Sequence, residues 1–586
     1  MGWLIDDFLD NISSKKIYFI IAVCIIGFLI YSNTFTAPFV FDDIGTVYGN
    51  NALRELNLLL EWWSFLKPRF LGYLTFLLNY KIAGWNLALY HLTNLLIHIL
   101  TTFFVWRLVL LIFETPRFKE SYISTHKKYI ALFCALIFLT HPIQTQAVTY
   151  IVQRFTALAA LFYILSVYFF IKARIKKSLS FFIFSIFSML LAFWSKENAF
   201  SIPVMLIVCE LYFFSNFRKF INLKFIALWI FFFAVCIKFI FQLVSLSDAF
   251  GKKVTFAGEN ITSQNYLISQ FGILIRYLKL LIILVGQSID HYESPINNIF
   301  EPSVVAGIIV LSFMVILAVI TFRKYRLISF SIAWFLVSMS VESSFIPIQD
   351  LMVEHRLYLP TFGFSLFITL IIYYFSRNKI AKKWPYVFVI LILIYGVMTF
   401  ARNNVWISKV SIWLDAVKKN SNNDRALTNL GGAYSKDKNY KQAQYYLDKS
   451  LSINPKNPDA LVIKGALIGQ QGQLDEALDL FYRALELFPN HIGAYSNIAV
   501  IYYKQEKYDE AANVYKKILE ISPDNVTVYE MLSYVLVLGG QEEEAKEYMQ
   551  KAIRLDSSSV DTFKKMEESL KKSRDTKSLE SSETIN

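Results

Sequence analysis

The chain has few charged residues and few cysteines for its length, and each shortage excludes a class of protein. Asp, Glu, Lys and Arg make up only 18% of the 586 residues, whereas 55% are hydrophobic. A soluble chain of this size cannot bury so much apolar surface. The four cysteines stand singly in apolar stretches, without a Cys-x-x-Cys pair, so we predict neither a zinc site nor a disulfide framework. No metal-ligand spacing is present, although paired acids do sometimes recruit a divalent cation.

Phenylalanine is nearly absent from the last third of the chain. Of the 53 phenylalanines, only Phe481, Phe488 and Phe563 follow residue 402, so the apolar residues belong to the first two-thirds. The net charge of +13 is not a nucleic-acid signal, because the basic residues stand in short clusters between apolar runs. Such clusters are typical of the loops that orient membrane helices.

A membrane-spanning helix needs about 20 apolar residues. We predict eleven spans, at 17–36, 86–113, 129–140, 156–171, 179–194, 199–214, 225–245, 302–321, 327–342, 358–375 and 385–401. A further apolar segment, 266–286, carries Arg276 and Lys279. We expect it to lie in the membrane interface, where long cationic side chains reach the headgroups.

Basic residues mark alternate loops, and the positive-inside rule places those loops in the cytoplasm. They include Lys15-Lys16, Arg117 to Lys128, Lys172 to Lys177, Arg218 to Lys224, Arg323 to Arg326 and Arg377 to Lys383. Eleven crossings then leave the N-terminal residues 1–16 inside and the C-terminal domain outside. If 266–286 also crosses, the C-terminal domain is cytoplasmic.

A 34-residue period begins at residue 424 and predicts tetratricopeptide repeats. It is carried by two sets of residues, Ala443, Ala477, Ala511 and Ala545, and Pro455, Pro489 and Pro523. The expected fold is therefore all-α, a polytopic membrane domain followed by a helical solenoid whose concave surface binds proteins or peptides. The predicted divisions are a membrane domain at 17–401, a linker at 402–423, four repeats at 424–557, and a capping helix with a disordered tail at 558–586.

Charged and polar residues stand at the outer ends of several predicted helices. Asp42 and Asp43 follow the first span, and paired acids at such a site suit general-base chemistry; the alternative is a turn or a helix cap. Three more groups lie at outer ends and favour one shared site, although each could be an interface anchor. They are His141 to Arg154, Lys196-Glu197 and Glu354-His355-Arg356.

These motifs, taken in order, resemble those of a known family. The matching stretches are Phe41-Asp42-Asp43, 73–80, 90–98, 141–154, Lys196-Glu197 and 356–360. Together with the repeats they are similar to the transmembrane-and-tetratricopeptide O-mannosyltransferases (the TMTC family) and their bacterial relatives. The animal proteins tend to have His and Glu where this chain has Gln144 and Gln146, and those two glutamines are expected only to form hydrogen bonds.

The resemblance implies a GT-C fold and a glycosyltransferase that moves a sugar from a polyprenyl-phosphate carrier to a protein or other envelope hydroxyl. It places the catalytic acid on Asp42 or Asp43. We expect Asp42 to be the base and Asp43 to hold sugar or acceptor, with exchange of roles left open. The candidates for binding the phosphate are Arg154, Lys196, Arg276 and Arg356. We expect His141 and His355 to relay protons or form hydrogen bonds, and Glu197 to pair with Lys196 or Arg154 rather than to react.

Composition rich in Lys, Ile, Asn and Phe is typical of a bacterial protein, which implies the inner membrane and undecaprenyl phosphate. Two other functions stay open. A non-catalytic scaffold predicts that the polar residues at the outer ends are replaceable together. A transporter of lipid-linked sugars predicts charges near mid-bilayer and paired internal halves, and neither is evident.

The predicted topology is testable by proteolysis. With eleven crossings, the repeats are exposed outside, and protease added to intact spheroplasts should remove them. Protection of the repeats until the membrane is permeabilised would show that the number of crossings is even.

Overall fold

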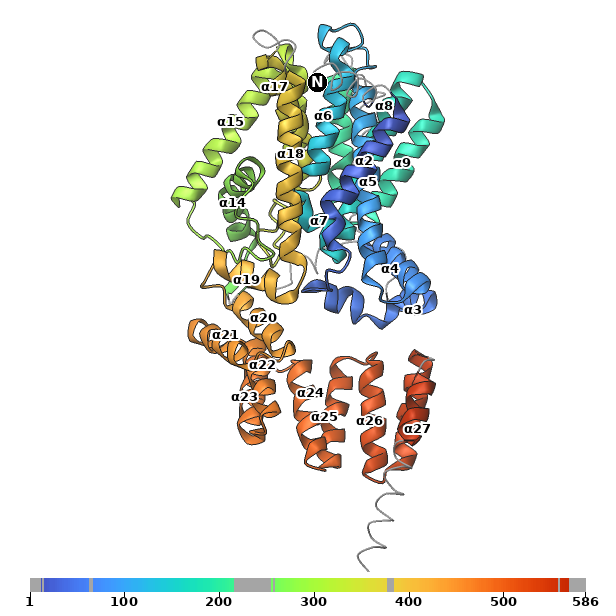
Figure 1. The fold of residues 1–586 in the computed structure, drawn as a ribbon, viewed down its shortest axis with the longest axis vertical. Coiled ribbons are helices and arrows are strands. Elements are labelled where there is room, and N and C mark those ends of the chain that lie inside the picture. Colours follow the sequence, from blue (N-terminus) through green and yellow to red (C-terminus); the bar gives the residue numbers. More distant parts are fainter. Residues whose placement is uncertain are drawn as a thin grey trace, which may run out of the picture. The chain divides into compact units, whose positions relative to one another are not determined.

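The computed structural model describes residues 12, 15–62, 67–214, 254–256, 259–376, 384–556 and 559–568 (Figure 1). The chain divides into two compact units, residues 1–415 and 416–586. The division falls within helix α19 (Lys409–Lys419), inside the segment predicted as a linker. The predicted all-α fold is confirmed, and the described strands are one antiparallel pair, β1 (Val254–Phe256) and β2 (Glu259–Ile261).

Unit 1 is a bundle of apolar helices that match the predicted spans. Ten of the eleven predicted segments coincide with described helices, and the other, 225–245, lies outside the described residues. The ten are α2 (Lys16–Tyr31), α5 (Leu87–Ile112), α6 (Lys127–Thr140), α8 (Arg154–Lys176), α9 (Leu179–Phe193), α10 (Ile202–Phe213), α15 (Pro302–Lys324), α16 (Arg326–Met339), α17 (Pro360–Ser376) and α18 (Trp384–Asn403). Among the described helices, seven are long and apolar enough to cross a membrane.

The helix α14 (Ser263–Ile283) corresponds to the segment expected in the interface. It is one of the seven long apolar helices, yet it is seen close to end-on in Figure 1, where α2, α5 and α18 are seen from the side. Its axis therefore lies across the bundle, as an interfacial helix does. Arg276 of α14 is 53% exposed, which suits a cation at headgroup depth.

Aromatic side chains fill the interior of unit 1. Phe19 stacks on Trp106 and Phe133 on Phe388, each pair with ring centroids 4.3 Å apart. In contrast, α15 exposes large apolar side chains such as Phe313. An apolar interior with an apolar exterior is the pattern of a helix bundle whose solvent is lipid.

Short polar segments join the helix ends at the end of the bundle that includes Asp42. The side-chain amide of Asn33, after α2, donates to Asn404 after α18 at 2.7 Å. At the same end, the Lys196 ammonium after α9 lies 2.7 Å from the Glu342 carboxylate after α16. Two shorter helices, α3 (Leu56–Trp62) and α4 (Phe70–Ala83), belong to this end as well (Figure 1).

Unit 2 consists of four helix pairs at the predicted period. The repeat alanines are fully buried, and an added Cβ on Gly431 would come within 2.7 Å of Leu447, so small residues allow the paired helices to approach. The pairs are α20 (Asp424–Lys436) with α21 (Tyr440–Ile453), α22 (Pro458–Gln470) with α23 (Leu474–Leu487), α24 (Ile492–Lys504) with α25 (Tyr508–Ile521), and α26 (Val526–Leu538) with α27 (Glu542–Leu555). Residues 559–568 continue as helix, and the end of the predicted tail lies outside the described residues.

Each repeat also has a side-chain cap that the period did not reveal. The first helix of every pair is capped by a side chain that accepts a backbone N–H. The four caps are Asn423, Asn457, His491 and Asn525.

The contact of α14 with α15 depends on Gly307. A Cβ placed there would lie 1.9 Å from the carbonyl oxygen of Phe271, which is backbone and cannot move aside. We expect Gly307→Ala to push the two helices apart and to destabilise unit 1 by about 1–3 kcal/mol, the usual cost of overpacking. The measurement is the thermal unfolding midpoint of the detergent-solubilised protein. Gly396→Ala is the matched control, because its Cβ would meet only the Ile30 side chain at 3.5 Å; equal midpoints for the two variants would contradict the account.

Candidate functional site

The two adjacent acids of the first loop have different surroundings. Asp43 is 1% exposed, and its two carboxylate oxygens accept the backbone N–H groups of Val40 at 3.1 Å and Val152 at 2.7 Å. Burial raises the pKa of the Asp43 carboxyl well above its usual range, while these hydrogen bonds act in the opposite direction. Asp42, in contrast, is exposed. Asp43 therefore anchors the loop, and Asp42 is the acid at its surface.

The backbone around Asp42 is held in an unusual conformation. Phe41 has a φ of 47°, a left-handed value that a bulky residue rarely adopts, and its ring packs edge-on against Trp413 at 5.5 Å. The N–H of Asp42 donates to the Tyr150 hydroxyl at 2.8 Å. Such strain costs of order 1–3 kcal/mol and persists where the surroundings hold it, often at functional sites.

A cluster of charges lies at the start of α4 and the ends of α9 and α16. Glu197 pairs with Arg69 at 3.2 Å, not with Lys196 or Arg154 as expected, and both residues are partly exposed. Lys196 is buried, pairs with Glu342 at 2.7 Å and donates to the Thr156 hydroxyl at 3.1 Å. Burial lowers the pKa of the Lys196 ammonium, while the Glu342 carboxylate opposes that shift. Arg69 also has a left-handed backbone, with a φ of 69°.

His355 and Arg356 stand beside this cluster. The Arg356 guanidinium donates to the carbonyls of Leu351 at 2.8 Å and Asp350 at 2.7 Å. Burial lowers the pKa of His355 well below its usual range, and the charges of Lys196 and Arg356 lower it further. The cluster thus combines three cations, Arg69, Lys196 and Arg356, with three carboxylates, Glu197, Glu342 and Asp350.

Gln146 determines which ring nitrogen of His355 carries the proton. Its side-chain oxygen accepts the backbone N–H of His355 at 2.7 Å and lies 3.0 Å from Nδ1 of the ring. An amide oxygen can only accept, so Nδ1 is protonated and Nε2 keeps its lone pair. The amide nitrogen of Gln146 faces the carbonyls of Ser288 and Ile289, which fixes its orientation.

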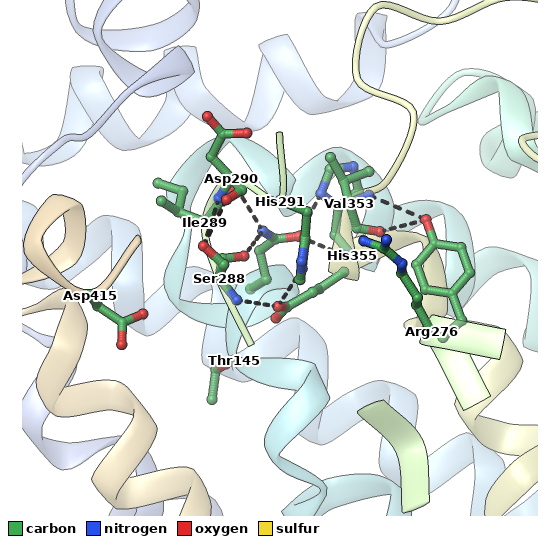
Figure 2. A network of polar contacts seen from close by, with 12 residues as sticks. Thr145, Arg276, Ser288, Ile289, Asp290, His291, Val353, His355 and Asp415 are labelled. Carbon is green, nitrogen blue, oxygen red and sulfur yellow. Dashed lines mark hydrogen bonds and ion pairs between the residues drawn. The ribbon is translucent and has the colours of Figure 1, made fainter. Parts of the chain in front are cut away.

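Figure 2 shows His355 amid the polar segment that follows α14. Ser288 and His291 both bind the Glu354 carboxylate, His291 through Nε2 at 2.9 Å. Arg276, drawn in the same view, forms its ion pair with Glu293 of this segment. Helix α14 and the short helix Glu354–Leu357 thus both bind this segment.

Two of the predicted site residues are enclosed by internal hydrogen bonds. Arg154 is fully buried and donates to the side chains of Asn94 at 2.7 Å and Asn79 at 2.6 Å, and to the Tyr90 carbonyl at 3.0 Å. His141 is also fully buried. Its Nδ1 accepts the N–H of Ile143, and its Nε2 lies 3.0 Å from the Leu281 carbonyl. Burial lowers the pKa of His141 to about 4, so its ring is neutral.

The structure therefore divides the predicted site residues into groups. Lys196, Glu197, His355 and Arg356 come together in one cluster, and Asp42 and Asp43 are joined to it through the segment 142–156. This segment contacts Asp42 through Tyr150, His355 through Gln146 and Lys196 through Thr156. Their catalytic and binding roles stay predictions. Among the described residues, no group of three His, Cys, Asp or Glu side chains could hold a metal ion.

Sequence reasoning missed Arg69, Glu342 and Tyr150 as members of the site. Arg69 and Glu342 each stand at the end of an apolar helix, as the predicted residues do, and that position is the signal that could have found them. Tyr150 lies inside the predicted block 141–154, without a charge to single it out.

Comparison with known proteins supports both parts of the chain. Family models described as tetratricopeptide repeat match residues 424–457, 458–524 and 493–558. Human protein O-mannosyl-transferase TMTC3 is 23% identical over 557 residues, 83% of this chain and 58% of that protein. Mouse TMTC2 is 31% identical over 160 residues, 25% of this chain and 18% of that protein. This chain thus spans less than two thirds of these curated relatives.

A solved structure aligns with part of the chain. A crystal structure of MamA covers 26% of this chain and 83% of its own, with 22% identity and a TM-score of 0.23. The similarities to the TMTC proteins are the informative ones. The chain joins a membrane helix bundle to tetratricopeptide repeats and resembles, over most of its length, the protein O-mannosyl-transferases of the TMTC family.

The tautomer assigned to His355 leads to a prediction about its charge. In the native protein the ring is neutral at pH 7, because burial and nearby cations lower its pKa. Gln146→Glu places a carboxylate on Nδ1–H, which favours the charged ring and raises its pKa by roughly 1–3 units. Nitrogen-15 NMR of the labelled ring measures this. Gln146→Met is the uncharged control and should leave the ring neutral; an unchanged pKa in Gln146→Glu would contradict the contact.

Proposed function

We propose that the chain is a membrane glycosyltransferase of GT-C type that transfers a sugar from a polyprenyl-phosphate carrier to a hydroxyl of a protein or other envelope acceptor. The observation that carries this proposal is the position of Asp42. It is an exposed carboxylate on a strained loop, at the same end of a membrane bundle as a cluster of cations. The similarity to proteins named O-mannosyl-transferases supports mannose as the sugar and protein as the acceptor.

The proposed reaction needs a base for the acceptor and positive charge for the leaving group. Asp42 takes the proton of the acceptor hydroxyl as its oxygen bonds to the anomeric carbon of the sugar. The bond from that carbon to the phosphate oxygen breaks, and the phosphate leaves with the electron pair. Fixed cations aimed at this developing charge are often the largest catalytic contribution.

Arg69 is the cation best placed to meet the phosphate. It is 42% exposed and lies in the same cluster as Lys196 and Arg356, whose side chains are buried. Arg154 has a structural role instead, because its hydrogen bonds to Asn79 and Asn94 join α8 to α4 and α5.

The lipid carrier reaches this site from the bilayer, and the interfacial α14 lies at headgroup depth beside it. We place the site on the extracytoplasmic side of a bacterial inner membrane, opposite to the basic loops. The repeats of unit 2 recruit the acceptor or a partner protein on that side, since solenoids of this type bind peptides on their concave surface.

The proposal is tested by variants of the acidic pair. Asp42→Asn removes the base and should lower transfer of label from polyprenyl-phosphate mannose by about 10²–10⁴-fold, the usual contribution of a general base. Expression and membrane insertion should be normal. Glu120→Gln, an exposed acid at the other end of the bundle, is the matched control and should retain activity.

The outcome for Asp43 separates the two acids. In Asp43→Asn, one of the two backbone N–H groups that the carboxylate accepts faces the side-chain NH2 of asparagine. That hydrogen bond is lost, so we expect a lower yield of folded protein. Wild-type transfer by Asp42→Asn would remove Asp42 from the role of base.

A further inference from the structure

A pocket of about 450 Å³ lies at the end of unit 1 opposite to Asp42. Its walls come from the loop after α5, from the junction of α15 with α16, and from Tyr374 of α17. All of these are helix ends or adjoining loops, so the pocket lies where apolar spans give way to the headgroup layer. Nothing in the proposed glycosyl transfer uses it.

Four cations line this pocket, namely Arg117, Arg323, Lys324 and Arg326. No Asp or Glu is among the described residues that line it. Arg174, a cation at the same end of the bundle, is paired with a carboxylate. Its guanidinium forms two hydrogen bonds to the Glu210 carboxylate, at 2.7 and 2.8 Å. Among the described residues, Arg323, Lys324 and Arg326 form no such ion pair with a carboxylate.

The polar groups of the pocket are suited to phosphate. Arg326 is oriented by donation to the Tyr212 carbonyl at 3.1 Å and by the Phe322 ring, 4.5 Å from its guanidinium. Planar guanidinium groups can bind two phosphate oxygens at once. Tyr122 also lines the pocket, and a phenol hydroxyl can donate to such oxygens.

We propose that this pocket binds the phosphate-bearing headgroup of an anionic membrane lipid, in the leaflet opposite to the candidate active site. A lipid is favoured over free phosphate because an apolar track leads to the pocket along α15. Its side chains recur at helical spacing toward Arg323, and each is more than half exposed; they are Ile309, Phe313, Ile316 and Ile320. Acyl chains packed on that face place the headgroup at the four cations, where each basic residue adds to anionic-lipid affinity.

The test measures lipid bound to the full-length protein. Protein purified in mild detergent is mixed with phosphatidylglycerol or with phosphatidylcholine, and bound lipid is counted by native mass spectrometry over a range of lipid concentrations. The pocket variant is Arg323→Gln with Lys324→Gln, because both side chains are exposed and their removal spares the core. The control variant is Lys127→Gln with Lys128→Gln, which removes the same charge at the same end, outside the pocket walls.

The native protein should bind phosphatidylglycerol in preference to phosphatidylcholine, and inorganic phosphate should not displace it. The pocket variant should bind roughly 25-fold more weakly, since each of the two basic residues contributes roughly fivefold. The control should match the native protein. Equal losses in the two variants would overturn the proposal, because they indicate a diffuse surface charge. Displacement by millimolar inorganic phosphate would overturn the lipid in favour of a free-phosphate site.

Discussion

The interior of a bilayer offers no hydrogen-bond partners, and the arrangement of unit 1 depends on this constraint. Backbone groups in the spans are satisfied within helices, so irregular backbone and charges gather at the helix ends. Where a charge does lie inside the bundle, protein groups surround it. Arg154 is the clearest case, because its donors meet Asn79, Asn94 and the Tyr90 carbonyl. The same constraint brings chemical groups from distant parts of the chain to one end of the bundle.

At the end of the bundle that includes Asp42, differences in burial give neighbouring residues different roles. Asp43 is buried to accept two backbone N–H groups, and this holds the loop that exposes Asp42. Lys196 is buried against Glu342, whereas Arg69 and Glu197 are partly exposed. Breaking a buried pair by removing one partner typically costs 3–5 kcal/mol. The buried residues thus make a rigid frame, and the exposed ones are those to which the proposal assigns contact with substrate.

The helices and repeats could be predicted because their signals are local. Apolar length predicts a span, and a 34-residue period with alanines at helix crossings predicts a solenoid. The burial and the partners of the individual site residues could not be predicted, because they depend on contacts between residues far apart in the sequence. The burial of Asp43 depends on the N–H of Val152, and the placement of Arg69 depends on Glu197. Glutamine at position 146 indicated a hydrogen bond, and only the structure shows that its partner is His355.

The central claim is that the bundle end with Asp42 transfers sugar from a lipid carrier. The most direct measurement mixes the purified protein with radiolabelled polyprenyl-phosphate mannose and an envelope extract, then follows the label. The account predicts that label moves from the organic-soluble lipid to protein or another envelope acceptor, and that boiled protein does not support this. Absence of transfer from that carrier and from carriers of other sugars, by protein shown to be folded, would contradict it and favour a scaffold.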